Sequence, residues 1–443
     1  MVAKKLKSIV QTFSKDHAVF RTRHIHEKHL PWIRTRHIWT GILGTIYGTF
    51  LNPAGIYFTF FCFASDMSKF QFGIMASLVL FAVVFQIFSW TFENFWGNRK
   101  YPWYIFSILS RLCFVPIVFS FWIPLSPASI IALCFASAIL GNFAAPSWSS
   151  WLYDLISEDQ LAVFMSKRSA VIQLFTIGIA LFAGIAVQQS DQAHKMTIIR
   201  LVFAFGLISG IIDLFFHVRI PEPHKKTQKE KNDFLKVMTQ PLSDKKFRQW
   251  IMITVLWTIS INICESFFIP YMIKDLGFEN RFVLLTIISV CLVQMSGFFA
   301  FLFWGKAIDK IGTKKVFLVC HSFWAVIPLF YMFSKPHVSV ILISIPWIIN
   351  GIFVNGTTIV NPVITSMLTK AKQRSAYLAA MTITSSLCGG VGTLIGSLIV
   401  KYFSIWYVFP VSLIARIFSL VIIFIVILNG RIYDKIDEDV VGC

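Results

Sequence analysis

The sequence predicts an all-α polytopic membrane protein whose twelve transmembrane helices form two pseudo-symmetric six-helix bundles. Three observations lead to this fold class: the composition, a series of long apolar stretches, and an internal repeat. Hydrophobic residues make up 56% of the 443 residues and charged residues 14%, against roughly 45–50% and about 25% in soluble proteins. The mean hydropathy is +0.70. A soluble domain of this length could not bury so much apolar surface.

Twelve apolar stretches are long enough to cross a bilayer, which takes about 20 residues per helix. They lie at 37–64, 70–92, 101–123, 127–150, 162–188, 196–217, 249–272, 282–304, 314–333, 338–361, 375–400 and 405–428. Charged or turn-forming residues separate them. Each stretch is therefore expected to be one membrane-spanning helix.

One long polar segment divides these stretches into two halves. The expected organisation is a basic cytoplasmic N-terminal segment 1–36, a bundle 37–217, a cytoplasmic linker 218–248, a bundle 249–428 and a cytoplasmic tail 429–443. Asn142 and Asn355, Arg200 and Arg416, and the loops at 97–100 and 312–315 recur at a near-constant offset of about 215 residues, which indicates duplication. Two parallel halves are typical of alternating-access transporters.

The distribution of positive charge predicts the orientation. The formal net charge is +19, with 40 Lys and Arg residues. If both termini are cytoplasmic, only six of these residues lie in the opposite loops: Lys69, Lys195, Lys274, Arg281, Lys335 and Lys401. The positive-inside rule therefore places both termini in the cytoplasm, and a multi-pass protein of the cell inner membrane is expected. Basic loops facing anionic lipid account for the net charge, so no nucleic-acid partner is expected.

The first 36 residues are basic and weakly amphipathic. No apolar core follows within them, so a cleavable secretory signal is not expected. An interfacial helix on the inner leaflet is the preferred interpretation, and an organellar transit peptide is the alternative.

The sequence carries no pattern that requires a cofactor or metal. Of the eight cysteines, all but Cys443 lie in or beside apolar stretches without metal-ligand spacing, as small buried hydrophobes do. No phosphate-binding P-loop is present, so ATP is not expected to drive the protein directly. We expect no enzyme, no cofactor and no metal, and a protein that functions as a monomer.

The loop between the eighth and ninth stretches carries the most specific motif. It reads GKAIDKIGTKK and includes Gly305, Asp309, Lys310, Gly312, Lys314 and Lys315. This loop resembles the G-x-x-x-D-[RK]-x-G-[RK]-[RK] motif of the major facilitator superfamily, with Thr313 in place of a basic residue. The first-half copy keeps Gly97, Arg99 and Lys100 but has Asn94 where the motif has Asp. The resemblance covers the whole layout and implies solute transport by two rocking halves.

These loop residues are the expected gate. Asp309 is placed to cap a helix and pair with neighbouring cations, and Gly312 permits the tight turn. In the first half, Glu93 is the possible substitute for the missing carboxylate. The alternative is a positive loop that only sets the topology.

Glu265 is interpreted as the only carboxylate well inside a span. Thr258, Asn262 and Glu265 follow i, i+4, i+7 spacing and share one helix face. The resemblance places this helix at the transport cavity, where Glu265 would bind substrate or carry a proton. The alternative is a carboxylate near outer-surface water.

Three arginines lie within spans. Arg111 is near mid-depth and is a candidate anchor for an anionic substrate, because a guanidinium presents several donors. The alternative is that Arg111, Arg200 and Arg416 pair with groups inside their own half. Their positions in supporting helices favour that alternative for Arg200 and Arg416.

Amides and aromatic residues complete the predicted binding set. Amides beside proline breaks can satisfy freed backbone groups or offer hydrogen bonds to a solute. The candidates are Asn52, Asn142, Asn350, Asn355 and Asn361, together with Tyr57 and Trp148. The eleventh stretch carries small residues that allow close helix contact, namely Gly389, Gly390, Gly392 and Gly396.

The predicted function is secondary transport of a small polar or anionic solute, with protons as a possible coupling ion. Two alternatives stay open. One is a transporter-like membrane sensor or assembly subunit that moves no solute. The other is a polytopic membrane enzyme, which would need a cluster of catalytic side chains at one membrane face.

Overall fold

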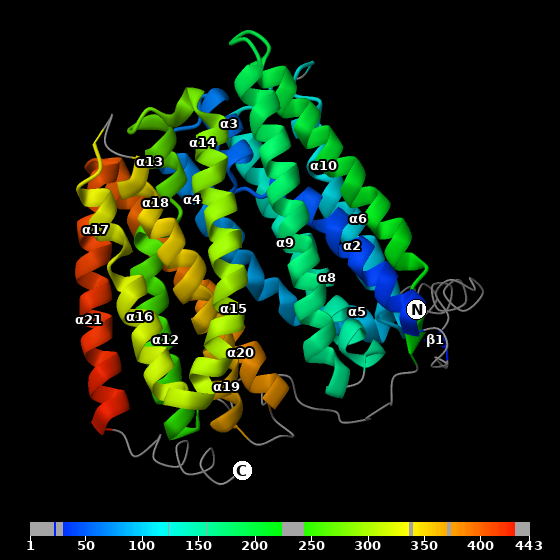
Figure 1. The fold of residues 1–443 in the computed structure, drawn as a ribbon. Coiled ribbons are helices and arrows are strands. Elements are labelled where there is room, and N and C mark those ends of the chain that lie inside the picture. Colours follow the sequence, from blue (N-terminus) through cyan, green and yellow to red (C-terminus); the bar gives the residue numbers. More distant parts are fainter. Residues whose placement is uncertain are drawn as a thin grey trace, which may run out of the picture. The chain divides into compact units, whose positions relative to one another are not determined.

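The computed structural model describes most of the chain. The described residues are 22–23, 30–122, 124–156, 158–223, 243–335, 340–369 and 374–429. Most of the basic N-terminal segment, the centre of the linker and nearly all of the tail lie outside these ranges, so the predicted interfacial helix falls outside them too. The described chain is almost wholly helical and forms two compact units (Figure 1).

The first unit comprises Met1–Met67 and Phe81–Lys229. Its helices are α2 (Leu30–Leu51), α3 (Ile56–Ala64), η3 (Ala82–Phe88), α5 (Ser89–Trp96), α6 (Lys100–Leu112), α7 (Val115–Val118), α8 (Pro127–Leu155), α9 (Glu158–Gln189) and α10 (Lys195–Val218). Two short strands, β1 (Thr22–Arg23) and β2 (Glu222–Pro223), pair in parallel.

The second unit comprises Ser68–Leu80 and Glu230–Cys443. Its longer helices are α4 (Lys69–Phe81), α12 (Lys245–Glu265), α13 (Phe268–Lys274), α15 (Leu292–Ile311), α16 (Thr313–Ala325), α17 (Ile327–Met332), α18 (Val340–Ile349), α19 (Asn355–Met367), α20 (Arg374–Tyr402) and α21 (Val408–Asn429). Short turns complete it: η4 (Phe278–Asn280), α14 (Phe282–Thr286), η5 (Ile287–Cys291), η6 (Asn350–Val354) and η8 (Ile405–Tyr407).

The predicted membrane-spanning helices are present. The described residues contain eleven helices long and apolar enough to cross a membrane, which correspond to the second to twelfth predicted stretches. The first stretch divides into α2 and α3, because Pro53 has no N–H to continue the helix. The Asn52 side-chain oxygen accepts a hydrogen bond from the Ala54 N–H at 3.1 Å and so satisfies one backbone donor at the break. The predicted all-α fold class is confirmed.

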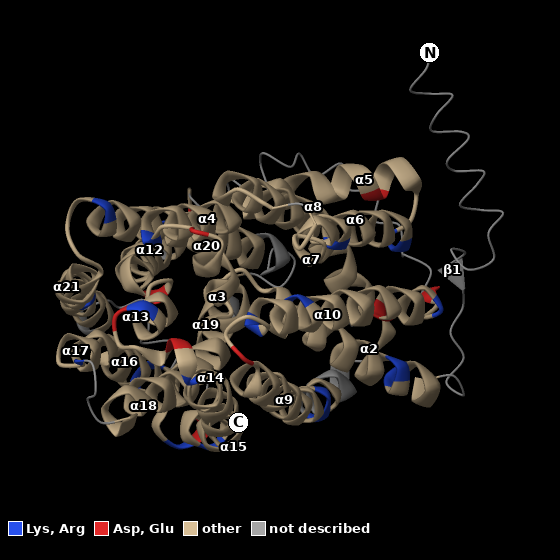
Figure 2. Ribbon diagram, turned by 90° about the horizontal axis from the view of Figure 1, so that it is seen from above, with Lys and Arg blue, Asp and Glu red and all other residues tan. Residues whose placement is uncertain are grey.

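The surface of the helices is apolar, as a lipid environment requires. Phe182 is 78% exposed, Ile341 73% and Phe403 70%. Figure 2 shows few charged positions along the helical ribbons. Exposure of this many large apolar side chains would cause a water-soluble protein to aggregate, so the exposed surface agrees with a multi-pass membrane protein.

The glycines of α20 bring this helix close to α12. A Cβ atom added at Gly392 would lie 2.5 Å from the Ile259 carbonyl oxygen, and one at Gly396 would lie 2.1 Å from the Ile263 carbonyl oxygen. Only glycine fits at these two positions, because backbone atoms cannot move aside. The expected close helix contact therefore occurs between α12 and α20.

Candidate functional site

A buried ion pair on α6 and α10 is the centre of the candidate site. The Arg111 Nη2 atom lies 2.6 Å from the Asp213 Oδ2 atom. Asp213 is 3% exposed and lies within a membrane-spanning helix. Asp213 is therefore a second carboxylate within a membrane-spanning helix, besides Glu265, and the sequence analysis did not select it. Asp213 precedes the predicted end of its stretch by only one helical turn, and the sequence alone does not distinguish a buried terminal turn from an exposed one.

His217 extends this ion pair by one helical turn. Its Nδ1 atom lies 2.8 Å from the Asp213 Oδ1 atom, and its Nε2 atom lies 3.2 Å from the Trp148 Nε1 atom. An indole N–H can only donate, so His217 Nε2 must accept. The remaining ring proton is then on Nδ1 and is donated to Asp213. This arrangement describes a neutral imidazole between Trp148 and Asp213.

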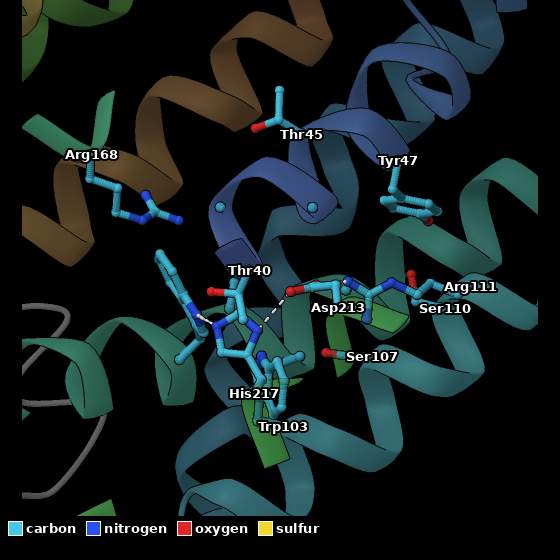
Figure 3. Close-up of a pocket in the computed structure, with 16 residues that line it drawn as sticks. Thr40, Thr45, Tyr47, Trp103, Ser107, Ser110, Arg111, Arg168, Asp213 and His217 are labelled. Atoms are coloured by element: carbon cyan, nitrogen blue, oxygen red, sulfur yellow. Dashed lines mark hydrogen bonds and ion pairs between the residues drawn. The ribbon is translucent and has the colours of Figure 1, made fainter. Parts of the chain in front are cut away.

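These side chains line a cavity of about 330 Å³ inside the first unit. This volume falls in the range of small-molecule sites, roughly 300–1,000 Å³. Figure 3 shows the Arg168 and Arg111 guanidinium groups on opposite sides of the view, with His217 and Asp213 between them. The polar and aromatic lining residues are Thr40, Thr45, Tyr47, Trp103, Ser107, Ser110, Arg111, Trp148, Arg168, Asp213 and His217.

Arg111 keeps donors that the protein does not use. Its Nε and Nη1 atoms are buried and have no hydrogen-bond partner among the described residues. The second guanidinium, of Arg168, donates from Nε to the His37 carbonyl oxygen at 3.1 Å. Of the described residues, two arginines and one carboxylate line the cavity, so this lining is net positive when His217 is neutral.

Glycines make room for both guanidinium groups. A Cβ atom at Gly41 would lie 2.8 Å from Arg168 Nη2, and one at Gly210 would lie 3.0 Å from Arg111 Nε. Any larger residue at either position would displace a guanidinium. The local sequence of α2 and α10 therefore sets the positions of both cations.

A second cavity, of about 250 Å³, lies inside the second unit. Side chains of α12, α16 and α19 line it. They include Thr258, Trp257, His321, Trp324, Thr358 and Asn361. Of the predicted binding residues, this cavity contains Asn361.

Glu265 lies near Arg416 rather than in either cavity. Its Oε2 atom is 3.8 Å from Arg416 Nη2, and the Asn350 side chain also hydrogen-bonds to its carboxyl group. Arg416 is fully buried and donates to Ser412 and to the Trp324 carbonyl oxygen. Arg416 thus pairs within its own half, and so does Arg200, which donates to Ser120 at 3.0 Å.

The other predicted binding residues of the first unit make contacts within the protein. Tyr57 is fully buried and donates to the Ala180 carbonyl oxygen at 2.6 Å. Asn142 accepts from Gln86 and donates to the Ala138 carbonyl oxygen, each at 2.8 Å. Neither side chain lines the cavity, in contrast to Arg111 and Trp148, which do.

In the second unit, Asn262 and Asn355 face neighbouring helices. Asn262 donates to the Thr258 carbonyl oxygen at 2.8 Å and lies against Gly389 of α20. Asn355 donates to the Gly351 carbonyl oxygen at 2.6 Å and lies against Gly297 of α15. Both amides satisfy helix carbonyls at helix contacts.

The first-half gating residues meet a carboxylate that the sequence analysis did not assign to them. Glu222 accepts from the Arg99 backbone N–H at 3.0 Å and from Arg99 Nε at 3.2 Å. It also accepts from the Lys100 backbone N–H at 3.3 Å. Glu93 accepts from Ser147 at 2.8 Å. Gly97 ends α5 with a positive φ of 76°.

The second-half gating residues surround a turn of the expected kind. Gly312 has a φ of 83° and joins α15 to α16. Asp309 and Lys310 are exposed in the last turn of α15, and within the described ranges Asp309 has no capping hydrogen bond or ion pair. Lys314 is half-buried and Lys315 is exposed, whereas Gly305 has open space around it.

The described part of the chain contains no group of three or more His, Cys, Asp and Glu side chains that could hold a metal ion. Its seven cysteines, residues 62, 113, 134, 264, 291, 320 and 388, are free thiols, five of them buried.

The fold is that of a multi-pass helical membrane protein, and each of its two units contains a cavity with polar lining residues. The sequence matches the family model of the Major Facilitator Superfamily over residues 38–302 and 292–438. The chain belongs to this superfamily and is a secondary transporter rather than an enzyme.

Solved transporters share the fold at low sequence identity. A point mutant of the nucleoside transporter NupG aligns with a TM-score of 0.70 and 12% identity, covering 90% of this chain and all (100%) of that one. A POT family transporter in complex with a thioalcohol-conjugated peptide gives a TM-score of 0.62 and 12% identity, with 92% and 97% coverage.

A bacterial homolog of the human lysosomal transporter Spinster, in an inward-facing and unoccupied conformation, gives a TM-score of 0.59 and 12% identity, with 94% and 98% coverage. No curated protein sequence matches the chain significantly. These similarities define the fold and leave the solute open.

Proposed function

We propose that the protein transports a small anionic solute by alternating access and that the cavity of the first unit binds the anion. The observation that carries this proposal is the pair of unused donors on Arg111, Nε and Nη1, which are buried beside the cavity. A buried cationic donor without a partner costs free energy. An anion within hydrogen-bond distance would recover that cost.

The balance of charge favours an anion over a neutral or cationic solute. In the part of the chain that the structure describes, Arg111 and Arg168 line the cavity together with one carboxylate, Asp213. Asp213 is already held by Arg111 and His217, so it has little capacity left for a cationic ligand. Tyr47, Trp103 and Trp148 supply apolar surface for the uncharged part of the solute.

Proton coupling belongs to the same proposal. His217 hydrogen-bonds to Asp213, and protonation of the ring would add a second net positive charge to the cavity lining. Glu265, paired with Arg416, is the proton-carrying group that the sequence predicts. These two groups are the candidates for coupling solute movement to a proton gradient.

The orientation is part of the proposal as well. The distribution of Lys and Arg supports cytoplasmic termini and an inner-membrane location. With this orientation the gating residues lie on the cytoplasmic side. A substituted-cysteine labelling experiment at Lys315 and Lys335, with reagents added to one side of sealed vesicles, tests this orientation.

Binding of matched solutes tests the anion site. Purified protein is screened by thermal shift against small carboxylates, phosphates and sulfonates, each paired with its neutral amide or alcohol. A ligand that binds the folded state raises the melting temperature by mass action. We expect the anions to raise it, and their effect to be lost in Arg111→Gln.

Arg200→Gln is the matched control, because Arg200 is an arginine of the same unit that does not line the cavity. This variant should respond as the wild type does. Equal stabilisation by the anions and their neutral partners, or an unchanged response of Arg111→Gln, would refute the proposed anion site. Flux of the anion that raises the melting temperature most is then measured in reconstituted vesicles, which tests transport itself.

A further inference from the structure

The cavity of the second unit differs in chemistry from that of the first. Among the described residues, no Asp, Glu, Lys or Arg side chain lines it. A charged ligand that entered it would lose its hydration without gaining an opposite charge, which is strongly unfavourable. An occupant of this cavity must therefore be uncharged.

Three residues that line this cavity nevertheless carry a polar side-chain atom without a hydrogen-bond partner among the described residues. The Trp257 Nε1, Trp324 Nε1 and Asn361 Oδ1 atoms are buried, and none has a hydrogen-bond partner among the described residues. All three residues line the cavity, and Trp257 is only 4% exposed. Buried polar groups in native proteins are nearly always paired. These two donors and one acceptor therefore require a partner that the described part of the chain does not supply.

The neighbouring histidine and threonines add acceptors. His321 Nδ1 lies 2.8 Å from the Phe317 carbonyl oxygen, so the ring proton is on Nδ1 and the Nε2 atom of the neutral ring accepts. Thr254 and Thr358 donate to helix carbonyl oxygens at 3.0 and 2.9 Å. Their hydroxyl oxygens retain lone pairs, and the lining therefore offers donors and acceptors together.

Aromatic rings form one wall of the cavity. The Trp257 and Trp324 rings meet edge to face with centroids 5.6 Å apart, and His321 lies 4.7 Å from Trp257. Aromatic walls favour a ring that stacks on them or meets them at its edge. The volume of about 250 Å³ is just below that of typical small-molecule sites, roughly 300–1,000 Å³, and so suits a single ring.

We propose that this second cavity is a binding site for a small uncharged ring compound that both donates and accepts hydrogen bonds. Trp257 and Trp324 donate to it, and Asn361 and His321 accept from it. This site is separate from the anion site of the first unit, and its existence does not depend on the proposed function of that site. A polyhydroxylated ring and a heteroaromatic amide both meet these requirements.

The test uses pairs of ring compounds that differ in charge. Purified protein is titrated calorimetrically with uracil and nicotinamide, with their carboxylate counterparts orotate and nicotinate, and with myo-inositol and glucose against glucose 6-phosphate. We expect at least one neutral compound to bind and its charged counterpart not to bind. Binding of uracil or nicotinamide, without binding of myo-inositol or glucose, would identify heteroaromatic amides as the ligand class. The reverse result would identify polyhydroxylated rings.

Trp257→Phe removes the indole N–H and keeps an aromatic ring. Loss of one hydrogen bond should weaken binding of the neutral compound about tenfold. Trp347→Phe is the matched control, because Trp347 is a tryptophan of the same unit that does not line the cavity. This variant should bind as the wild type does.

Asn361→Leu removes the acceptor at nearly the same volume and gives an independent readout if Trp257→Phe does not fold. It should also weaken binding, whereas Arg200→Gln, at an arginine that lines neither cavity, should leave binding of the neutral compound unchanged. Absence of binding by every neutral compound would overturn the proposal, because water would then account for the unpaired atoms. Equal affinities of Trp257→Phe and Trp347→Phe would overturn it too.

Discussion

Arg111 and Asp213 form a 2.6 Å ion pair between α6 and α10, with side chains that are 11% and 5% exposed. Removing two charges from water is costly, and a close ion pair recovers part of that cost. The pair occupies one Nη atom of the guanidinium, and the Nε and Nη1 atoms of this cavity-lining residue have no hydrogen-bond partner among the described residues. Asp213 thus compensates the buried charge of Arg111 and leaves other N–H groups of the guanidinium available to an anion.

Asp213→Asn tests this role of the pair. Removing one partner leaves a buried guanidinium without its counter-ion, so we expect a loss of about 3–5 kcal/mol in the free energy of unfolding. Asp275→Asn is the control, because Asp275 pairs with Lys69 at 2.7 Å while both side chains are about 30% exposed. An exposed pair contributes less than about 1 kcal/mol. Denaturant unfolding in detergent measures both variants, and similar losses would contradict the structural role of Asp213.

His217→Asn tests whether the histidine positions the ion pair. Its Nδ1 atom lies 2.8 Å from Asp213 Oδ1, and its Nε2 atom lies 3.2 Å from Trp148 Nε1. An asparagine side chain is too short to reach both partners, so Asp213 loses a hydrogen bond and Arg111 loses its fixed position. We expect the affinity for an anion to fall about tenfold, as the loss of one hydrogen bond implies.

Calorimetric titration with a sulfonate measures this affinity, since the charge of a sulfonate is constant near neutral pH. His194→Asn is the control and should bind as the wild type does, because His194 is exposed at the start of the same helix. An unchanged affinity in His217→Asn would contradict the positioning role of His217.

The sequence predicts the fold better than the site because the two depend on different information. Apolar length identifies the helices one at a time, and Pro53 accounts for the break in the first stretch. The partners of Arg111 and Arg99 are instead about a hundred residues away along the chain, at Asp213 and Glu222. Such partners become visible only when the helices are packed.

The sequence contains a partial signal for the partner of Arg111. Asp213 and His217 have the i, i+4 spacing that places two side chains on one helix face. Their position near the end of a stretch concealed their burial. Amides illustrate the opposite case, because Asn142, Asn262 and Asn355 are polar residues in spans whose hydrogen bonds go to helix carbonyls of their own units.

Glycine substitutions test the close contact of α12 and α20. Gly392→Ala and Gly396→Ala each place a Cβ atom within 2.5 Å of a backbone carbonyl oxygen of α12. The helices must move apart, so we expect each variant to lose about 1–3 kcal/mol, as overpacked cores do. Gly178→Ala on α9 is the control, because nothing lies within 4 Å of its added Cβ.

The control should be neutral or stabilising by up to about 1 kcal/mol, since alanine favours a helix over glycine. Thermal unfolding of the three purified variants ranks them. Melting temperatures of Gly392→Ala and Gly396→Ala at or above that of Gly178→Ala would show that the contact between α12 and α20 tolerates added volume.

Glu265→Gln tests proton coupling in the second unit. Arg416 keeps its hydrogen bonds to Ser412 and to the Trp324 and Ile261 carbonyl oxygens in this variant, so the fold should persist. A glutamine cannot carry a proton through the cycle. If Glu265 couples transport to protons, uptake of the anion identified by thermal shift should lose its dependence on an imposed pH gradient in reconstituted vesicles. Exchange of that anion between equal pools at equal pH should continue, because exchange needs no net proton movement.

Glu279→Gln is the control, since Glu279 is 44% exposed and pairs with Lys274 at 3.4 Å. Uptake by Glu265→Gln that matches the wild type under every gradient would leave His217 as the remaining candidate for coupling.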